Sequence, residues 1–456
     1  MRARRFKVNS KIIFLFTVLS AICAIYPLAV IMVMIGCFLY FLKDIPLNRL
    51  NEKLFFVVLI SAFFGPYLAL PAFPSLFLFR IVLWLHLFVF LFSKKELEKL
   101  KRIKVPLVCL GIWLLYAIFS LVWTENLSLS LPALYFQFEM LYLIFIVSYY
   151  IDSIAKLKKT FKWLAIAVGL SIFVGLWESV MGQHLFYSAG NLLSYQDFRA
   201  TGFLVNTNDY SVYLSFYAPI LFLLLLEKKT WFSSFMALGL MGILFFIIIQ
   251  TESRSGLISF VLILLILLWK LIGNKLFFIV CSILGTLAIC VYLGTHTLSF
   301  ESLAFLSGKT DSTNERLLIY ESVGRLVLEH HFLGVGPGVT PLYVFDALYG
   351  TVNVPVDVDD TMSAHNFWLS NLADVGFIGI CPFLIFFSWM VIKAIKYGVK
   401  KGHLLKVVPL CILVAFIAST VASSSIFEMR VVWIGLGIGI AIIQLLQKKE
   451  EENICD

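Results

Sequence analysis

Long apolar runs separated by short polar stretches recur along this chain from one end to the other. Most hold about 20 residues, the length that an α-helix needs to cross roughly 30 Å of hydrocarbon. Within the apolar stretch 12–42, Pro27 removes a backbone donor and favours two spans instead of one. The pattern predicts 14 membrane-spanning helices, at residues 12–26, 27–43, 54–71, 74–93, 105–123, 131–150, 163–181, 209–226, 231–250, 255–269, 276–296, 376–392, 407–425 and 431–446.

The composition excludes a soluble protein. Of the 456 residues, 61% are hydrophobic and only 14% are charged, and the mean hydropathy is +0.95. Such a chain has far more apolar sequence than a soluble core needs. We therefore expect an all-α fold, a polytopic membrane helix bundle.

Lys and Arg residues are divided unevenly between the predicted loops. With 14 spans and a cytoplasmic N-terminus, the inner segments hold 29 of the 36 Lys and Arg residues. This excess is the signature that orients membrane proteins, and it places both termini in the cytoplasm. The net charge of +9 is then explained by loops that face anionic lipid, and no nucleic-acid partner is expected.

The cations left for the outer face differ in kind from those inside. Arg presents a rigid fork that grips phosphate or carboxylate through two bonds, which favours an anionic ligand at the outer leaflet. The alternative is ion pairing with nearby carboxylates such as Glu252 and Glu428. The outer set contains one Lys and six Arg: Arg80, Arg199, Arg254, Lys309, Arg316, Arg325 and Arg430.

Residues 297–375, between the eleventh and twelfth spans, are the longest polar interruption and too long for a plain connector. Ser312-Thr-Asn-Glu315 has the pattern of a capping box and predicts a helix at about 313–331. Arg316 would then lie in the first turn, where backbone N–H groups and the positive end of the helix dipole also attract an anion. The alternative is an amphipathic helix on the bilayer, with its apolar side chains facing lipid: Leu317, Tyr320 and Val327.

His365, which precedes Asn366 near the end of this segment, is the candidate catalytic group. Near neutral pH an imidazole can accept a proton from a sugar hydroxyl, as glycosyl transfer to an alcohol requires. Three acidic residues upstream are similar to the pairs that hold metal and sugar nucleotide in many glycosyltransferases. Because sugar nucleotides are cytoplasmic and this loop is outside, we expect a solvated loop and no metal there: Asp357, Asp359 and Asp360.

Four outer motifs, taken in order, resemble the O-antigen polymerase and O-antigen ligase superfamily. The resemblance covers about residues 195–380, and the remainder matches only as apolar spans. The motifs are Arg199-Ala-Thr-Gly-Phe203 running to Asn206-Thr-Asn208, Thr251-Glu-Ser-Arg254-Ser-Gly256, Asn314-Glu-Arg316 running to Gly334-Val-Gly-Pro-Gly338, and His365-Asn366 followed by Gly376-x-x-Gly379.

The resemblance implies a membrane glycosyltransferase of the C type in the bacterial cytoplasmic (inner) membrane, using neither metal nor cofactor. Its donor would be a glycan on undecaprenyl diphosphate at the outer face. By the matching motifs, Arg254 and Arg316 would hold the diphosphate, and His365 would activate or orient the acceptor hydroxyl. Further candidates for the substrate cavity are Arg199, Arg430 and Asn366.

Acceptor attack from the face opposite the departing diphosphate predicts inversion of the anomeric centre. Asp374 stands where the family often carries Glu, which leaves the role of this carboxylate open. The expected architecture is GT-C-like with three parts: spans one to eleven in residues 1–296, an extracytoplasmic loop with the active-site residues in 297–375, and the last spans with a cytoplasmic tail in 376–456.

Within the superfamily, 14 spans favour a polymerase of lipid-linked repeat units, for an O-antigen, capsular, exopolysaccharide or teichuronic-type polysaccharide. The alternative is a ligase that transfers the glycan to lipid A core or protein. Expected partners are the lipid-linked glycan, an acceptor glycan or lipid, a flippase and a chain-length regulator. A transporter of the lipid-linked glycan is the alternative from another class, and it is disfavoured because no internal repeat is found.

Overall fold

The computed structural model describes residues 46–70, 73–186, 198–294, 310–330, 332–349, 366–422 and 426–455. The first two predicted spans, the three aspartates at 357–360 and the candidate catalytic His365 lie outside these residues. The chain divides into two compact units, one of Met1–Leu54 with Val82–Lys95 and one of Phe55–Ile81 with Glu96–Asp456. In the smaller unit the side chains of Asn51 and Ser93 are hydrogen-bonded at 3.2 Å.

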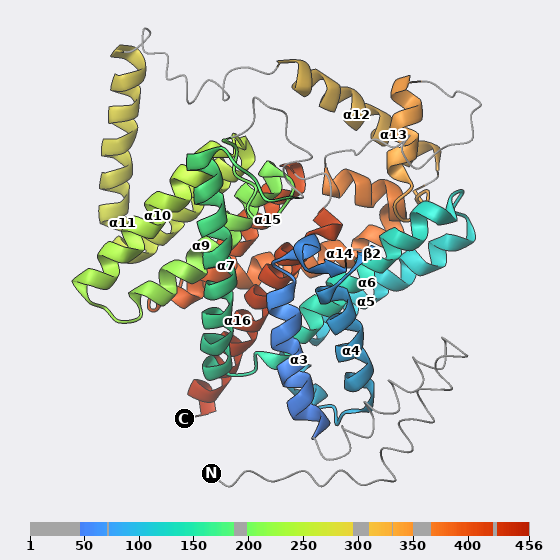
Figure 1. Cartoon of the computed structure of the whole chain (residues 1–456), viewed down its shortest axis with the longest axis horizontal. Coiled ribbons are helices and arrows are strands. Elements are labelled where there is room, and N and C mark those ends of the chain that lie inside the picture. The colour runs from blue at the N-terminus through green and yellow to red at the C-terminus, as the bar shows by residue number, and fades with distance from the viewer. Residues whose placement is uncertain are drawn as a thin grey trace. The chain divides into compact units, whose positions relative to one another are not determined.

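Helices make up nearly all of the described chain (Figure 1). One short antiparallel hairpin, β1 (Ala69–Leu70) and β2 (Phe73–Phe77), pairs Ala69 with Phe77. The α-helices are α3 (Leu47–Ser61), α4 (Leu78–Phe92), α5 (Lys104–Phe119), α6 (Leu127–Tyr150), α7 (Ile154–Met181), α9 (Thr207–Leu226), α10 (Trp231–Gln250), α11 (Arg254–Gly294), α12 (Thr310–Glu329), α13 (Thr340–Tyr349), α14 (Phe367–Gly398), α15 (Val408–Ala422) and α16 (Arg430–Cys455). Short 3₁₀ helices lie at η1 (Gly65–Leu68), η2 (Leu97–Ile103), η3 (Ser120–Val122), η6 (Leu404–Val407) and η7 (Ile426–Glu428).

Within the described residues, eight helices are long and apolar enough to cross a membrane. This confirms the expected helix bundle of an integral membrane protein. The total of 14 spans stays a prediction, because it includes residues outside the described part. The eight are Leu97–Val122, Leu127–Tyr150, Ile154–Met181, Thr207–Leu226, Trp231–Gln250, Arg254–Phe277, Phe367–Gly398 and Arg430–Glu452, with shorter apolar helices at Leu78–Phe92 and Leu404–Thr420.

Polar residues just before the helices set where several of them begin. The side-chain oxygens of Asn126, Ser153 and Asn206 accept hydrogen bonds from backbone N–H groups in the first turns of α6, α7 and α9. Thr230 forms a full capping box with Ser233 at the start of α10. These caps satisfy N–H groups that have no partner within the helix.

α9 and α16 are the most buried of the spanning helices, and they form the centre of the larger unit. Tyr210, Tyr213 and Tyr217 follow one another along the inner face of α9, and all three are buried. The hydroxyl of Tyr217 donates to the backbone carbonyl of Val431 at 2.6 Å, in the first turn of α16. A buried hydroxyl needs such a partner, so this bond fixes α9 against the start of α16.

Glycines break two of the long helices. Gly273 (φ +75°) interrupts α11, between the predicted spans 255–269 and 276–296. Gly376 (φ +66°) interrupts α14, which begins at Phe367, not at residue 376 as predicted. The sequence places the boundary too late because Asn366 caps the helix before the apolar run starts.

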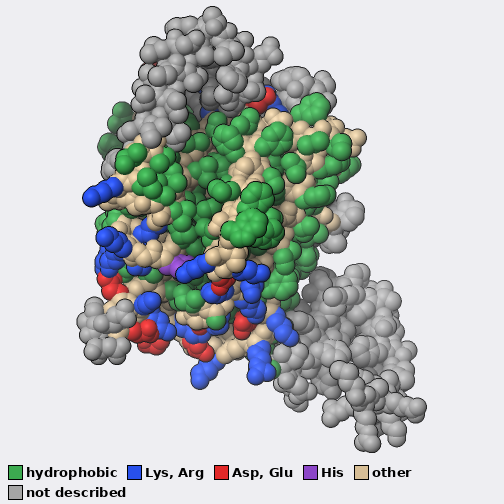
Figure 2. Space-filling view, turned by 90° about the vertical axis from the view of Figure 1, so that its left-hand side faces the viewer, with side chains coloured by type: hydrophobic (Ala, Val, Ile, Leu, Met, Phe, Trp, Pro, Cys, Tyr) green, Lys and Arg blue, Asp and Glu red, His purple; other side chains and the backbone are tan. Residues whose placement is uncertain are grey.

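Apolar side chains cover much of the face seen in Figure 2, and charged side chains gather toward its lower part. Many large apolar side chains in the larger unit are exposed, among them Leu115, Phe119, Phe173 and Trp231. In water such a surface would drive aggregation, whereas in a bilayer it is the surface that meets lipid.

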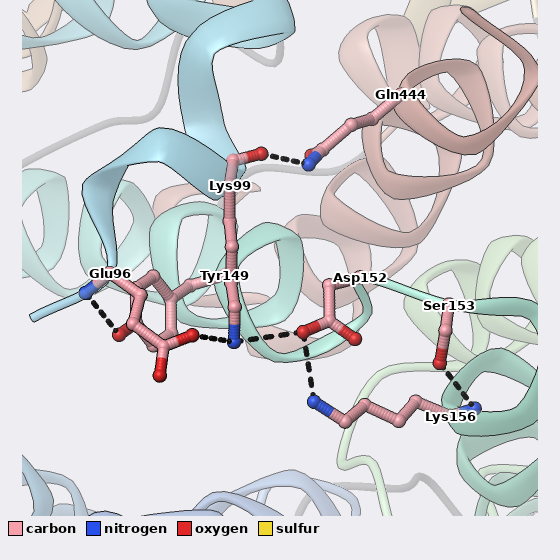
Figure 3. A network of polar contacts seen from close by, with 7 residues as sticks. All are labelled: Glu96, Lys99, Tyr149, Asp152, Ser153, Lys156 and Gln444. Atoms are coloured by element: carbon pink, nitrogen blue, oxygen red, sulfur yellow. Dashed lines mark hydrogen bonds and ion pairs between the residues drawn. The ribbon is translucent and has the colours of Figure 1, made fainter. Parts of the chain in front are cut away.

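Asp152, between α6 and α7, anchors a polar network at one end of the helices (Figure 3). Its carboxylate lies 2.9 Å from the ammonium groups of both Lys99 and Lys156. Lys99 also pairs with Glu96 at 2.6 Å, and its carbonyl accepts a hydrogen bond from Gln444 of α16. Burial opposes ionisation of Asp152, but its bonds to the two lysines outweigh that effect and lower its pKa.

Candidate functional site

Glu178, near the end of α7, fixes the first motif in place. Its carboxylate is fully buried and accepts hydrogen bonds from the backbone N–H groups of Thr201 (2.8 Å) and Gly202 (2.7 Å) and from the Thr201 hydroxyl (3.0 Å). The ring nitrogen Nδ1 of His184 lies 3.2 Å from the same carboxylate. Sequence reasoning missed Glu178, although a carboxylate inside an apolar span is a usual signal of function or pairing.

Gly202 in this motif has a positive φ and lies close to Tyr210, and both features disfavour a residue with a Cβ. Its φ is +57°, and a Cβ at this position would overlap the ring of Tyr210. Tyr210 is in turn fixed by its hydroxyl, which donates to the Ser171 carbonyl at 2.6 Å. The glycine therefore allows the loop to lie directly on α9.

An ion pair between Arg199 and Glu252 joins the first motif to the second. Arg254, two residues later, is the first residue of α11 and half-buried. Gly256 packs on Ser211 of α9 so closely that a Cβ there would overlap the serine hydroxyl. The structure thus brings the first two motifs together through Arg199 and Glu252, the local ion pair that the sequence left open as an alternative.

The third and fourth motifs are held together by backbone hydrogen bonds. Val335 and Gly336 donate to the carbonyls of Ala373 and Asp374, both at 2.9 Å, and Phe377 donates to the carbonyl of Phe332 at 2.8 Å. The break in α14 at Gly376 makes this exchange possible, because it turns backbone groups of the helix toward the loop. A Cβ at Gly376 would overlap the Phe332 carbonyl oxygen.

The carboxylate of Asp374 is buried and turned toward the start of α13. It accepts hydrogen bonds from the backbone N–H groups of Gly338 (2.9 Å) and Thr340 (3.1 Å) and from the Thr340 hydroxyl (2.5 Å). Carboxylates favour the positive end of a helix, so Asp374 acts as a cap for α13. The role of Asp374, which the sequence left open, is therefore structural: its carboxylate joins α14 to the start of α13.

Two aromatic residues, Tyr116 of α5 and Trp123 just after η3, form hydrogen bonds with the glycine-rich loop. Tyr116 donates its hydroxyl proton to the Leu333 carbonyl, and the Trp123 ring N–H donates to the Gly334 carbonyl, both at 3.0 Å. A Cβ at Gly336 would overlap Thr124. The glycines in this loop are thus required by close packing against neighbouring helices.

α12 differs from the helix expected for Arg316. It begins at Thr310, so Ser312 is not its cap and Arg316 lies beyond the first turn. The predicted start of this helix at about residue 313 is therefore too late, and the role of Arg316 stays a prediction. Val327 is buried in a cluster with neighbours from α13, α14 and the glycine-rich loop, so it does not face lipid as the alternative required; the buried members are Ile319, Val323, Leu326, Val327, Val335, Val339, Val344 and Ala373.

Asn366 caps α14 by accepting hydrogen bonds from the N–H groups of Trp368 (3.1 Å) and Leu369 (3.2 Å). The next residue, Phe367, packs against Phe427 and Trp433, with ring centres 5.0 Å and 6.2 Å away. The start of the fourth motif therefore lies beside the start of α16, where Arg430 is the first residue.

Arg430 pairs with a carboxylate that the sequence did not suggest. Its Nε lies 2.6 Å from Oε1 of Glu139, a buried residue in the middle of α6, whereas Glu428 had been the expected local partner. Arg80, near the start of α4, approaches the other oxygen of Glu139 at 3.9 Å. A carboxylate so far inside a spanning helix is costly without a cation, and tertiary packing supplies two.

Among the predicted site residues, the described contacts form two groups. Arg199 and Arg254 belong to one, and Arg430 with the helix capped by Asn366 belongs to the other. Within the described residues, no group of three or more His, Cys, Asp or Glu side chains could hold a metal ion.

Comparison with known proteins agrees with this arrangement of motifs. Residues 239–384 match the family model described as O-antigen ligase. The chain is also similar to "Teichuronic acid biosynthesis protein TuaE" of Bacillus subtilis (strain 168), with 22% identity over 447 residues, which cover 88% of this chain and 86% of that protein. The matched segment contains the Arg254 motif and the paired glycine motifs. The resemblance found in the sequence is thereby confirmed: this membrane protein is similar to the O-antigen ligase and polymerase superfamily.

Proposed function

We propose that the protein polymerises lipid-linked oligosaccharide repeat units at the outer face of the bacterial inner membrane, with both termini in the cytoplasm. The curated relative is named for teichuronic acid biosynthesis, which supports a cell-wall polysaccharide as the product. The donor in this proposal is a glycan on undecaprenyl diphosphate, and the acceptor is a hydroxyl of a second lipid-linked repeat.

The observation that carries the proposal is the position of Arg254 at the first residue of α11. A cation is unfavourable at the positive end of a helix, where an anion is stabilised. Just before it, Glu252 pairs with Arg199 of the 199–203 loop, which Glu178 holds in place, and we call Glu178, this loop and the ion pair the Arg254 platform. A guanidinium at the start of a helix suits a diphosphate.

The chemistry follows from that placement. As the bond between sugar and diphosphate breaks, negative charge develops on the leaving group, and a preorganised Arg254 stabilises it in a partly dry site. Arg316 is the second diphosphate ligand in this proposal, on the strength of its motif. His365 takes the proton of the acceptor hydroxyl, which attacks from the opposite face and inverts the anomeric centre.

A ligase is the second candidate, because the matching family model is described as O-antigen ligase. Polymerase and ligase use the same donor and the same leaving group. They differ in the acceptor, which is another lipid-linked repeat for a polymerase and lipid A core or protein for a ligase.

The test is reconstitution in nanodiscs with undecaprenyl diphosphate that carries the host's repeat unit. A ladder of repeat lengths on a gel, confirmed by mass spectrometry, is the expected product. Arg254→Gln and His365→Ala should each lower the rate by about 100-fold or more. The matched control is Arg325→Gln, because Arg325 is an exposed outer arginine paired with Glu321 of the same helix, and it should leave the rate unchanged.

Two other results would change the conclusion. Transfer only after lipid A core or a protein acceptor is added would make the protein a ligase. No transfer to any acceptor, by a protein that stays folded, would contradict the glycosyltransferase and favour a transporter of the same lipid.

A further inference from the structure

Four apolar residues are exposed together where the glycine-rich loop meets α14. Phe332 and Leu333 are each 44% exposed, and Phe377 and Ile378, just after the break in α14, are 48% and 59% exposed. The rings of Phe332 and Phe377 pack edge to face, with their centres 5.1 Å apart. These four residues, which we call the loop patch, therefore form one contiguous apolar surface.

Phe332 has a backbone conformation that a large side chain disfavours. Its φ is +66°, in the left-handed region, where a Cβ comes too close to the backbone and glycine is favoured. A glycine would adopt this conformation at lower cost, so the turn itself does not require Phe. Strained residues of this kind occur mainly at functional positions. The strain at Phe332 therefore indicates that its exposed ring serves a contact outside the chain.

The carbonyl groups of this loop are hydrogen-bonded within the protein, as a segment that meets hydrocarbon requires. That of Phe332 accepts from a backbone N–H of α14 at 2.8 Å. Those of Leu333 and Gly334 accept from the side chains of Tyr116 and Trp123, both at 3.0 Å. Lipid offers a backbone group no hydrogen bond, so an irregular segment can face it only where the protein supplies the partners. These three successive carbonyls meet that condition.

The neighbouring helices place the loop patch at the edge of the hydrocarbon. Tyr116 lies in the last turn of α5, and Trp123 follows soon after that helix ends. Tyr and Trp gather at the interface between membrane and water. Phe377 is the first residue of α14 after the break at Gly376, where the apolar run of this helix begins. Both helices therefore put the patch at the level where a span leaves the acyl chains.

The loop patch also continues the lipid-facing surface of these two helices. α14 exposes Leu384 and Ile385, which lie seven residues after Phe377 and Ile378 and so on the same helix face. α5 packs against α14 and exposes Phe119 near the same end. On a spanning helix, exposed apolar side chains of this size meet the acyl chains of lipid. Acyl chains are therefore the partner that fits the patch.

We propose that the loop patch inserts into the acyl chains of membrane phospholipid, in the outer leaflet of the proposed topology. The inserted rings hold the glycine-rich loop at a fixed depth. They hold the start of α13 with it, because Asp374 joins the loop to that helix. The segment 297–375, which the sequence predicts to be extracytoplasmic, then enters the membrane at residues 332–333. This proposal does not depend on the transfer reaction.

Photo-crosslinking of the full-length protein in phosphatidylglycerol nanodiscs tests the insertion. The photoreactive residue p-benzoylphenylalanine replaces Phe332 or Phe377. It replaces Phe119 as the lipid-facing control and Arg325, an exposed charged residue of α12, as the control in water. Mass spectrometry should find phospholipid adducts at residues 332, 377 and 119, at yields about tenfold or more above that at residue 325.

Hydroxyl-radical footprinting of the wild-type protein in the same nanodiscs needs no substitution, and it decides the matter if the Phe332 variant does not fold. The radicals form in water, and acyl chains exclude them. Phe332 should therefore be oxidised about tenfold more slowly than in a free peptide of the same sequence. A Phe332 ring that faced water at 44% exposure would be protected far less.

Three results would overturn the proposal. Phospholipid adducts at residue 377 without any at residue 332, or oxidation of Phe332 as in the peptide, would show that the loop lies in water. An adduct of residue 332 with a second copy of the chain would make the patch a protein interface. An adduct with a polyprenyl lipid retained through purification, in place of phospholipid, would make it a site for the carrier. Because no glycan is present, none of these results bears on the proposed function.

Discussion

Asp374 accepts a hydrogen bond from the backbone N–H of Gly338 at 2.9 Å, so the buried carboxylate of α14 holds the end of the glycine-rich loop. The same carboxylate caps α13 through Thr340. Two motifs that lie 36 residues apart in the chain thus act as one structural unit.

Asp374→Asn should destabilise that unit. An amide oxygen is a weaker acceptor, and its NH₂ group would face backbone donors, so we expect a cost of about 2–3 kcal/mol. Thr340→Val removes the hydroxyl bond alone and should cost about 1 kcal/mol. Thermal unfolding in detergent measures both, and hydrogen exchange should quicken at residues 333–349 in the aspartate variant. Equal costs for the two variants would contradict the bracing role.

Gly376→Ala should be among the most damaging single changes in the last motif. The positive φ costs roughly 1–2 kcal/mol for a residue with a Cβ, and that Cβ would overlap the Phe332 carbonyl. Gly324→Ala, in the interior of α12 with nothing near its added Cβ, is the matched control and should gain up to about 1 kcal/mol. The melting temperatures of the two variants test this prediction. A Gly376→Ala variant with an unchanged melting temperature would show that α14 is not broken at this residue.

Glu178→Gln should make the 199–203 loop of the Arg254 platform more mobile, while Arg254 itself is unchanged. The variant replaces a buried carboxylate that accepts three hydrogen bonds from Thr201 and Gly202, so hydrogen exchange at residues 199–208 should rise at least tenfold. Binding of undecaprenyl diphosphate at Arg254 should weaken with it. Glu227→Gln removes an exposed partner of Lys158 and should change neither quantity. Unchanged exchange in Glu178→Gln would refute the anchoring of the loop.

The Asp152 network should make stability depend on pH. Because the pKa of Asp152 is lowered in the folded protein, its ion pairs stabilise the fold above the ordinary carboxyl pKa of about 4. That contribution is lost as the pH falls through the lowered pKa. Asp152→Asn should therefore cost about 1 kcal/mol near pH 7 and nothing once Asp152 is protonated in the wild type. Melting curves of both proteins between pH 7 and pH 3 give the difference, and a constant difference would disprove the linkage.

The sequence by itself determined the class of protein and most of its spans. Whether a helix crosses a membrane depends on the length and polarity of a contiguous run, which is a local property. The ends of the helices follow less directly from the sequence. Asn366 and Gly376 show why, because a cap and a glycine break move the start of α14 by nine residues from the edge of the apolar run.

The motifs also singled out Arg254 and the glycine segments, since arginines and glycines are visible in the sequence. Which carboxylate faces which arginine was decided only by the tertiary structure. Glu139 and Glu178 lie within apolar spans, and their partners Arg430 and Thr201 are 291 and 23 residues away. Ion pairs and buried hydrogen bonds form between groups that packing brings within about 3 Å, and no periodicity or spacing in a chain encodes that distance.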